Sequence, residues 1–408
     1  MVISRKHRIR ELKKHRRILI CPLEWGLGHA GRCLPLAAEL KNMGHEIIFA
    51  AGEKHLAFLR VEFPDARFIV FPGFNPSYSC FIPMWVVMAI KSPCLLYHII
   101  REHFALNKII RDHNIDAVIS DNRLGLWNAG AQSIYITHQL RIIFPKWTLF
   151  CEPLVAAIHR WFIKKYDYCL VPDLEGENNV SGKLSHGLKL SSEVRFIGLL
   201  SRFWDGSIDL KPSSGKTKDY ILLILSGPEP QKTIFKDKVV NALVEEDVDL
   251  VILGAEPGGG PGETNCANDG HVRVEGAVEK NRSQKWADGG ERAEPIRKSG
   301  VRVTYYDHLP MARMRDMILN SGSIIARSGY TSIMELLSLG RSALLVPTPG
   351  QTEQEYLAKR LPEKGWFTAV EQNRIGPGLI QNIHKLSAHN NLMEESRLLL
   401  EETLKNIF

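Results

Sequence analysis

The sequence lacks a cysteine framework. Its seven cysteines are odd in number and scattered, and no two of them form a C-x-x-C pair. This pattern argues against a disulfide-stapled secreted domain and against a zinc site, and it fits reduced thiols. A signal peptide is not recognisable either, because the basic run 4–17 is followed only by a short apolar stretch and then Glu24. We therefore expect a cytosolic protein.

Long uninterrupted apolar runs are also missing. The most apolar stretch, residues 80–100, is broken by Pro83, Lys91 and Pro93, whereas a membrane-spanning helix needs about 20 mainly apolar residues. Two interpretations stay open: a buried helical pair, or a partly exposed face that lies on a membrane. Residues 141–166 add weight to the second, because they interleave aromatic and cationic side chains as interfacial segments do.

The length and composition indicate an ordinary globular chain. Its 408 residues, 44% of them apolar, are enough for two packed domains. Much of the formal net charge of +7 lies in the N-terminal basic run, which is typical of a solvated tail. Because this run is the only feature that suggests nucleic-acid binding, we expect no nucleic-acid partner.

Short β-branched runs alternate with helical segments along the chain. This order predicts an α/β fold with two doubly wound, Rossmann-like domains. A segment rich in Pro, Gly and Ser separates the two, and a Gly-rich, charged segment with few large apolar residues interrupts the second. The predicted parts are a basic tail (1–16), an N-terminal domain (17–200), a linker (201–219), a C-terminal domain (220–385) with a mobile insertion (255–300), and a C-terminal helix (386–408).

Three polar clusters follow strands of the first domain. Ligands of open α/β sheets bind beyond the carboxyl ends of the strands, so these clusters should share one edge. A base, a carboxylate and hydrogen-bonding side chains there suit an acceptor site, where a hydroxyl must be positioned and deprotonated; the alternative is that each only satisfies loop backbone. The candidates are Gly28, His29, Arg32, Asp121, Asn122, Arg123, His138 and Gln139.

The glycines of the first loop imitate a dinucleotide fingerprint. Gly26, Gly28 and Gly31 have the G-x-G-x-x-G spacing, and Glu53 stands where a ribose-binding acid would. In that fingerprint, however, the first glycine follows almost directly on the strand. Here four residues intervene, among them the bulky Trp25, so we favour a loop that carries side-chain chemistry.

The second domain contains strand-to-helix turns suited to an anion. After "SIIA", the Ser328-Gly329 turn leads into a helix whose first amides, at Tyr330 and Thr331, would bind a diphosphate. Glu335, one turn later, would bond a ribose diol, although Ser332 and Glu335 also have the spacing of a capping box.

Two further turns complete the predicted site. Glu353 and Gln354 begin the helix after "VPTPGQT" and would bind sugar hydroxyls, while Glu355 reads as the capping-box partner of Thr352. Ser226 and Gly227 form a third turn suited to phosphate, with fewer amide donors because of Pro228 and Pro230.

These residues resemble a known family. The "GLGH" loop, together with "ARSGYTSIMELLSLGRSALLVPTPGQTEQEYLA" (326–358), is similar to glycosyltransferase family 28. The resemblance implies a GT-B fold, in which two Rossmann-like domains face each other across a cleft. It also implies a nucleotide sugar as donor, usually a UDP-sugar, and an inverting mechanism that needs no metal or other cofactor.

The resemblance also assigns roles to residues. His29 corresponds to the histidine proposed as the base. Ser328, Gly329 and Thr331 would contact the diphosphate, Glu335 the ribose and Gln354 the sugar. We keep Asp121 as an alternative base. Asp247 and Asp249 have the D-x-D form of metal-using transferases, but they stand at a helix-to-strand turn and read as solvated.

The sequence thus predicts an inverting transferase that moves a hexose or N-acetylhexosamine from a UDP-sugar to a hydroxyl of a glycan or a lipid-linked sugar. A lipid-linked acceptor, and with it a peripheral position on the inner face of the membrane, is a hypothesis from segments 80–100 and 141–166. Two alternatives stay open: a hydrolysing nucleotide-sugar epimerase, and a non-catalytic subunit that binds a nucleotide sugar at the membrane.

Overall fold

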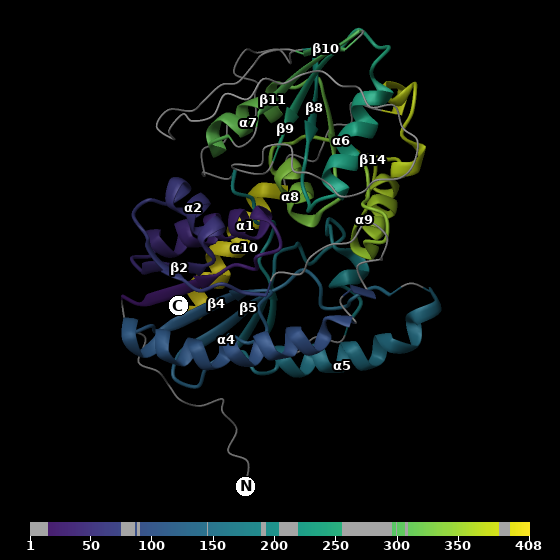
Figure 1. The fold of residues 1–408 in the computed structure, drawn as a ribbon. Helices are drawn as coiled ribbons and strands as arrows, with labels where there is room; N and C mark the ends of the chain where they lie inside the picture. Colours follow the sequence, from purple (N-terminus) through teal and green to yellow (C-terminus); the bar gives the residue numbers. More distant parts are fainter. Residues whose placement is uncertain are drawn as a thin grey trace.

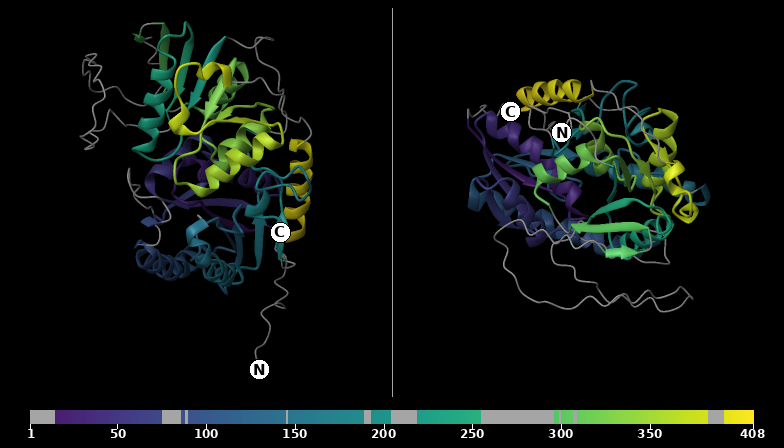
Figure 2. Two further views of the ribbon diagram at one scale, coloured as in Figure 1. Left: turned by 90° about the vertical axis from the view of Figure 1, so that its right-hand side faces the viewer. Right: turned by 90° about the horizontal axis from the view of Figure 1, so that it is seen from above.

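A computed structural model shows two α/β halves stacked on each other (Figures 1 and 2). It describes residues 15–74, 86–87, 90–144, 146–188, 193–203, 219–254, 296–298, 300–306, 309–382 and 392–408. Residues 1–14 of the predicted tail and most of the predicted linker and insertion lie outside these ranges.

The first half is built on a parallel sheet of seven strands in the order β3-β2-β1-β4-β5-β6-β7. The strands are short, and β1, β2, β4, β5 and β6 are mostly buried, as expected for a sheet covered on both faces, whereas the edge strands β3 and β7 are partly exposed. The strands are β1 (Arg17–Cys21), β2 (Glu46–Ala51), β3 (Arg67–Val70), β4 (Ala117–Asp121), β5 (Gln132–Ile136), β6 (Tyr168–Val171) and β7 (Val194–Phe196).

Helices cover both faces of this sheet. One core packs helices against β1, β2 and β4 through side chains such as Leu36 and Leu59, and a second core on the other face includes Leu106. The helices and 3₁₀ segments are α1 (Leu27–Asn42), α2 (Glu53–Glu62), α4 (Ser92–His113), η2 (Lys146–Cys151), α5 (Glu152–Ile163) and η3 (Gly182–Leu184).

The second half repeats this plan with the order β10-β11-β9-β8-β12-β13-β14, parallel except for the β10–β11 pair. Strand β10 lies within the predicted insertion 255–300, so residues 296–298 of that range belong to the sheet. The strands are β8 (Tyr220–Ile224), β9 (Asp249–Leu253), β10 (Ile296–Lys298), β11 (Val301–Tyr306), β12 (Ser323–Ala326), β13 (Leu344–Leu345) and β14 (Thr368–Ala369).

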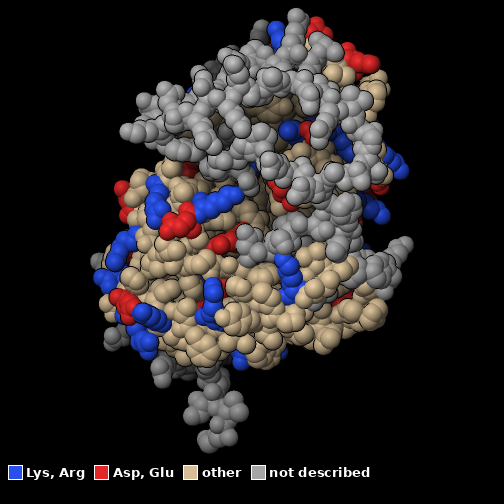
Figure 3. All heavy atoms as spheres, in the orientation of Figure 1, with Lys and Arg blue, Asp and Glu red and all other residues tan. Residues whose placement is uncertain are grey.

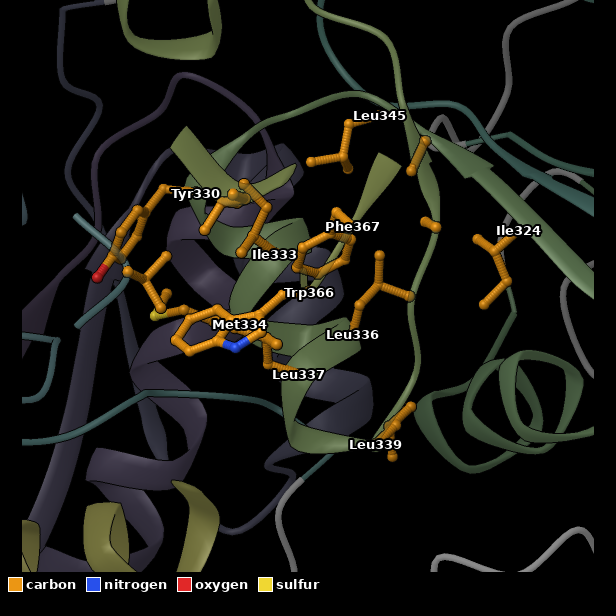
Figure 4. Packing of buried hydrophobic residues seen from close by; sticks show 14 of the residues in the cluster. Ile324, Tyr330, Ile333, Met334, Leu336, Leu337, Leu339, Leu345, Trp366 and Phe367 are labelled. Atoms are coloured by element: carbon orange, nitrogen blue, oxygen red, sulfur yellow. The ribbon is translucent and has the colours of Figure 1, made fainter. Parts of the chain in front are cut away.

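Helix α8 (Tyr330–Ser338) is the central packing element of the second half. Its Ile333, Met334 and Leu337 pack with Trp366 and Phe367 in one continuous core (Figure 4). The other elements of this half are α6 (Gln231–Ala242), α7 (Met311–Asn320), α9 (Thr352–Glu363), η4 (Gln372–Arg374) and η5 (Leu379–Asn382).

The chain returns to the first half at its C-terminus. Helix α10 (Leu392–Ile407) buries Leu400, Leu404 and Ile407 in the core of the first sheet, beside α1 (Figure 1). Gly198 contacts this helix so closely that a Cβ atom there would lie 2.3 Å from the Cα of Ser396. The C-terminal helix therefore fastens the end of the second half to the first.

The two strand orders predict where ligands bind. In each sheet the direction of winding reverses at one point, between β1 and β4 in the first and between β8 and β12 in the second. A crevice forms beyond the carboxyl ends of the strands at such a point. The loops after β1, β4, β8 and β12 carry many of the predicted site residues, and the loops after the neighbouring strands β5 and β13 carry the others.

Helix α4 corrects one interpretation of the sequence. Over residues 92–100 the segment is not a buried helical pair: Leu96, Tyr97 and Ile100 are exposed. Helix α4 therefore has the exposed apolar side chains that the second interpretation expects, while residues 80–85 and 88–89 of this segment lie outside the described ranges. None of the helices that the structure describes is long and apolar enough to cross a bilayer.

Candidate active site

His29 stands in the first turn of α1, directly beyond β1. The sequence predicts a helix that begins at Ala30, but α1 begins three residues earlier, at Leu27. Gly26 makes this possible, since its φ of 111° allows a sharp turn that other residues rarely adopt. His29 is therefore held by helical backbone and not at the tip of a loop.

The imidazole of His29 is oriented by Asp121 at the end of β4. His29 Nδ1 lies 2.8 Å from Asp121 Oδ2, and Arg32 grips the same carboxylate with its Nε, 3.0 Å from Oδ2, and with its Nη2. Burial by itself would raise the pKa of Asp121, but the charge of Arg32, followed by that of His29, outweighs it and holds this pKa at about 2.

This arrangement fixes the tautomer of His29. Because Asp121 is ionised it can only accept a hydrogen bond, so Nδ1 of His29 carries the proton and Nε2 keeps a free lone pair. Burial, and then the charge of Arg32, lower the pKa of His29 despite the opposing effect of Asp121. His29 is thus neutral near pH 7 and can accept a proton at Nε2.

Asp121 is poorly suited to the role of alternative base. Its carboxylate is fully buried and bonded to Arg32 and His29, and a pKa of about 2 makes it a weak proton acceptor at neutral pH. We therefore assign Asp121 the positioning of His29 and not the removal of a proton.

His138, after β5, joins the two halves of the protein. Its Nδ1 lies 3.1 Å from Arg32 Nη1 and its Nε2 lies 3.0 Å from Glu353 Oε1 in the first turn of α9. Since Arg32 can only donate, Nδ1 accepts and Nε2 donates to Glu353. Gln139 donates to the other oxygen of Glu353. The three polar clusters thus meet at one rim and reach a carboxylate of the second half.

Helix α8 begins opposite α1. Tyr330 stacks on His138 with ring centroids 4.2 Å apart, and a Cβ atom on Gly28 would lie 3.2 Å from Thr331 Oγ1. The helix begins at Tyr330 after Gly329, and no side chain caps its first amides. Ser332 and Glu335 therefore form no capping box, and the amides at the start of α8 are available to an anion.

Glu335 is engaged by a residue that sequence reasoning missed. Arg202, at the start of the predicted linker, places its Nε 2.8 Å from Glu335 Oε1. Burial raises the pKa of Glu335, and Arg202 opposes that effect. No local pattern marks Arg202, because its contact joins positions 133 residues apart. A ribose that binds Glu335 must share this carboxylate with Arg202.

Two polar residues in the first turn of α9 have different partners: Glu353 contacts the first half, and Gln354 binds its own loop. Glu353 faces His138. Burial raises the pKa of Glu353, but His138, with smaller effects of His29 and Arg32, lowers it overall. Gln354 accepts from Thr348 N at 2.9 Å. The predicted Thr352 cap is wrong, since the Thr352 hydroxyl donates to Ile143 O and Glu355 accepts from Gly350 N.

The remaining candidates take different positions. Ser328 donates to Gln354 O at 2.9 Å, and Asn122 adopts a left-handed φ of 54° behind Asp121. Arg123 does not belong to the site, because its guanidinium is buried against Glu102 and Phe71 O inside the first half. Ser226 and Gly227 lie at the end of β8, where Gly227 is exposed with a φ of 92°.

The described residues form no metal site. No group of three or more His, Cys, Asp or Glu side chains in those ranges is placed to hold a metal ion. Asp249 of the D-x-D pattern pairs with Arg302 at 2.6 Å at an exposed edge, as expected for a solvated turn.

The chain is similar to known glycosyltransferases. The model of the glycosyltransferase family 28 C-terminal domain matches residues 282–407. An uncharacterized glycosyltransferase of Methanosarcina acetivorans is 25% identical over 360 residues, which cover 84% of this chain and 82% of the relative. A UDP-N-acetylglucosamine–N-acetylmuramyl-(pentapeptide) pyrophosphoryl-undecaprenol N-acetylglucosamine transferase of Haemophilus influenzae is 28% identical over 102 residues, 23% of this chain and 29% of that protein.

Solved structures support the fold. The glycotransferase of kitacinnamycin superposes with a TM-score of 0.57 at 16% identity and covers 95% of both chains. The calicheamicin glycosyltransferase superposes with a TM-score of 0.53 at 14% identity, over 96% of this chain and 94% of that one. Both are similar in their two-domain architecture, and the predicted GT-B fold is confirmed.

Proposed function

Since the chain is a glycosyltransferase of the family 28, GT-B type, we propose that it moves a hexose or N-acetylhexosamine from a UDP-sugar to an acceptor hydroxyl with inversion. One observation carries this proposal. The N-terminal turn of α1, with a neutral His29, faces the uncapped N-terminal turn of α8 across the contact of Gly28 with Thr331. A proton acceptor and helix amides suited to an anion are thereby brought together where the two halves meet.

The reaction is a single displacement. His29 Nε2 takes the proton of the acceptor hydroxyl while its oxygen forms a bond to the anomeric carbon. The bond from that carbon to the diphosphate oxygen breaks, and the electron pair leaves with UDP. Attack from the face opposite the leaving group inverts the anomeric configuration. Asp121 stabilises the imidazolium that forms, because its charge lies 2.8 Å from Nδ1.

The leaving diphosphate is stabilised by the second half. The first amides of α8 and the positive end of its dipole face the place where charge develops. Ser328 and Thr331 stand in that turn, Glu335 binds the ribose, and Glu353 and Gln354 bind hydroxyls of the sugar. In this proposal the diphosphate is bound by backbone N–H groups, and no metal ion is required.

The acceptor is best explained as a lipid-linked sugar. Exposed apolar side chains follow a stripe along α4 and another along η2 and α5, and the two helices run along the same side of the first half (Figures 1 and 2). We call this surface the α4–α5 face. It consists of Leu96, Tyr97, Ile100, Phe104, Leu149, Phe150, Leu154, Ile158 and Trp161.

Charge on the α4–α5 face suits an anionic membrane. Exposed cations stand beside the apolar stripes at Arg101, Lys108, Arg111, Arg160 and Lys164. The acids of these helices are mostly neutralised, since Glu102 pairs with Arg123 and Glu152 with Arg141. In Figure 3 the region over both helices is largely uncharged. Such a surface binds an interface by apolar insertion and by attraction to anionic lipids.

A screen of nucleotide sugars by thermal shift tests the donor. A donor at 100 times its dissociation constant should stabilise the protein by about 2.7 kcal/mol, and we expect this for UDP-sugars over GDP- and TDP-sugars. The anomeric configuration of the product then tests inversion, and a product with retained configuration would contradict the mechanism. Release of free UDP without any acceptor would instead indicate a hydrolysing epimerase.

A further inference from the structure

Arg327 is a buried cation in the second half, next to the donor turn. It follows β12 and directly precedes Ser328, and it is only 1% exposed. Its guanidinium lies over the ring of Phe235, 4.1 Å from the centroid. Within the described part of the chain no carboxylate forms an ion pair with it, and its Nε atom has no hydrogen-bond partner there.

The contacts of Arg327 join three loops. Nη2 donates to Gln231 O at the start of α6, at 2.8 Å. Nη1 donates to Val346 O and Pro347 O after β13, at 3.3 and 3.2 Å. One guanidinium therefore connects the turns after β8, β12 and β13, which are the three turns that hold the predicted donor-binding residues.

A charge buried without a counter-charge is costly unless something compensates it. Carbonyl oxygens satisfy some of the N–H groups of Arg327 but leave its net charge in place. Burial lowers the pKa of Arg327 to about 9, which still leaves it protonated at neutral pH. A ligand that carries negative charge would supply the counter-charge that Arg327 lacks among the residues that the structure describes.

We infer that Arg327 is a positioning residue that ties the three donor-binding turns together and holds one uncompensated positive charge behind them for a diphosphate. The inference rests on the proposed function, because it takes a nucleoside diphosphate as the ligand. The planar guanidinium suits this task because it donates hydrogen bonds in several fixed directions while it stays charged. A lysine would keep the charge but could not make these bonds in the same directions.

Two variants separate the charge from the hydrogen bonds. Arg327→Lys keeps the charge and loses most of the bonds, whereas Arg327→Gln keeps two N–H donors and loses the charge. Binding of UDP and of uridine is measured by calorimetry for each protein. The ratio of the two dissociation constants is a property of the folded fraction alone, so partial unfolding of a variant does not affect it.

We expect Arg327→Gln to weaken UDP binding by about 10-fold or more, as is usual for loss of one charge-assisted interaction, and uridine binding by less than about 3-fold. Arg327→Lys should keep most of the preference for UDP. The inference would be overturned if Arg327→Gln left the ratio of the UDP and uridine dissociation constants unchanged, whether or not binding of both ligands weakened.

Arg341 provides a matched control. Its guanidinium is also partly buried and bonded to carbonyls, with Nη1 3.1 Å from Leu319 O and Nη2 2.6 Å from Ser321 O, but these precede β12, at the opposite end of the strand from Arg327. Arg341→Gln should leave the ratio unchanged, and an equal change in both variants would overturn the inference. Absence of binding of any nucleoside diphosphate to the wild-type chain would instead contradict the donor proposal itself.

Discussion

His29 Nδ1 and Asp121 Oδ2 lie 2.8 Å apart, at the carboxyl ends of two adjacent strands. The pair has the geometry by which a carboxylate fixes the tautomer of a histidine and leaves its second nitrogen free. In the mechanism that we propose, His29 exchanges the proton and Asp121 orients it, whereas the sequence left both residues as candidate bases.

Replacement of the base should abolish most transfer. For His29→Gln we expect the turnover number to fall by about 10²–10⁴-fold, the usual contribution of a general base. The affinity for UDP should stay within a small factor, since His29 lies on the acceptor side. Initial rates at saturating donor check this, and turnover near that of the wild type would remove His29 from the mechanism.

The pH profile should report the environment of His29. Because burial and Arg32 lower its pKa from 6.5, the neutral form persists below pH 6.5, and transfer should be lost only as pH falls through that lower value. Asp121→Asn removes the anion that favours imidazolium, so the acid limb should move to still lower pH while turnover drops. An acid limb that stays in place in the variant would contradict this pairing.

Glu335 should distinguish ribose from deoxyribose. The wild-type protein should bind UDP more tightly than 2′-deoxy-UDP, by about 1–3 kcal/mol if the lost hydroxyl leaves the buried carboxylate short of a partner. Glu335→Gln should reduce that difference. Calorimetry with both nucleotides measures it, and an undiminished preference would leave Glu335 with Arg202 as a structural pair only.

Glu353 should select neutral donor sugars. Burial raises its pKa, but His138, His29 and Arg32 together lower it. The donor sugar that we propose to bind there would therefore meet a carboxylate, which should repel a uronic acid. We expect little use of UDP-glucuronate compared with UDP-glucose, and a smaller difference in Glu353→Gln. Competition assays with both donors test this, and equal discrimination by both proteins would refute it.

The α4–α5 face should bind anionic vesicles. Leu154 and Leu398 are both exposed helical leucines, at 66% and 61%, but only Leu154 belongs to this face. Leu154→Glu should lower the fraction that sediments with phosphatidylglycerol vesicles, and Leu398→Glu should not. Full recovery of the wild-type protein in the supernatant would refute the membrane proposal.

Much of the fold follows from local patterns. Short β-branched runs between helical segments identify most strands of both sheets, because alternation of this kind is compatible with few architectures. The short strands β10 and β14 were not predicted, since three and two residues are too few to form a pattern. The Ser328-Gly329 turn and the helix after it are also local, as are the residues at the strand ends. Helix starts were less predictable: α1 includes Gly28 and His29, since Gly26 could turn the chain sooner than the pattern suggested.

The sequence by itself thus determined the two α/β domains, the resemblance to family 28 and most of the side chains at the rim. Tertiary structure alone decided their partners. Arg202 reaches Glu335, His138 reaches Glu353, and Arg123 turns away from the site. The physical reason is that these contacts join residues far apart in the chain, where neither propensity nor spacing acts, and only the packing of the two halves sets which charges meet.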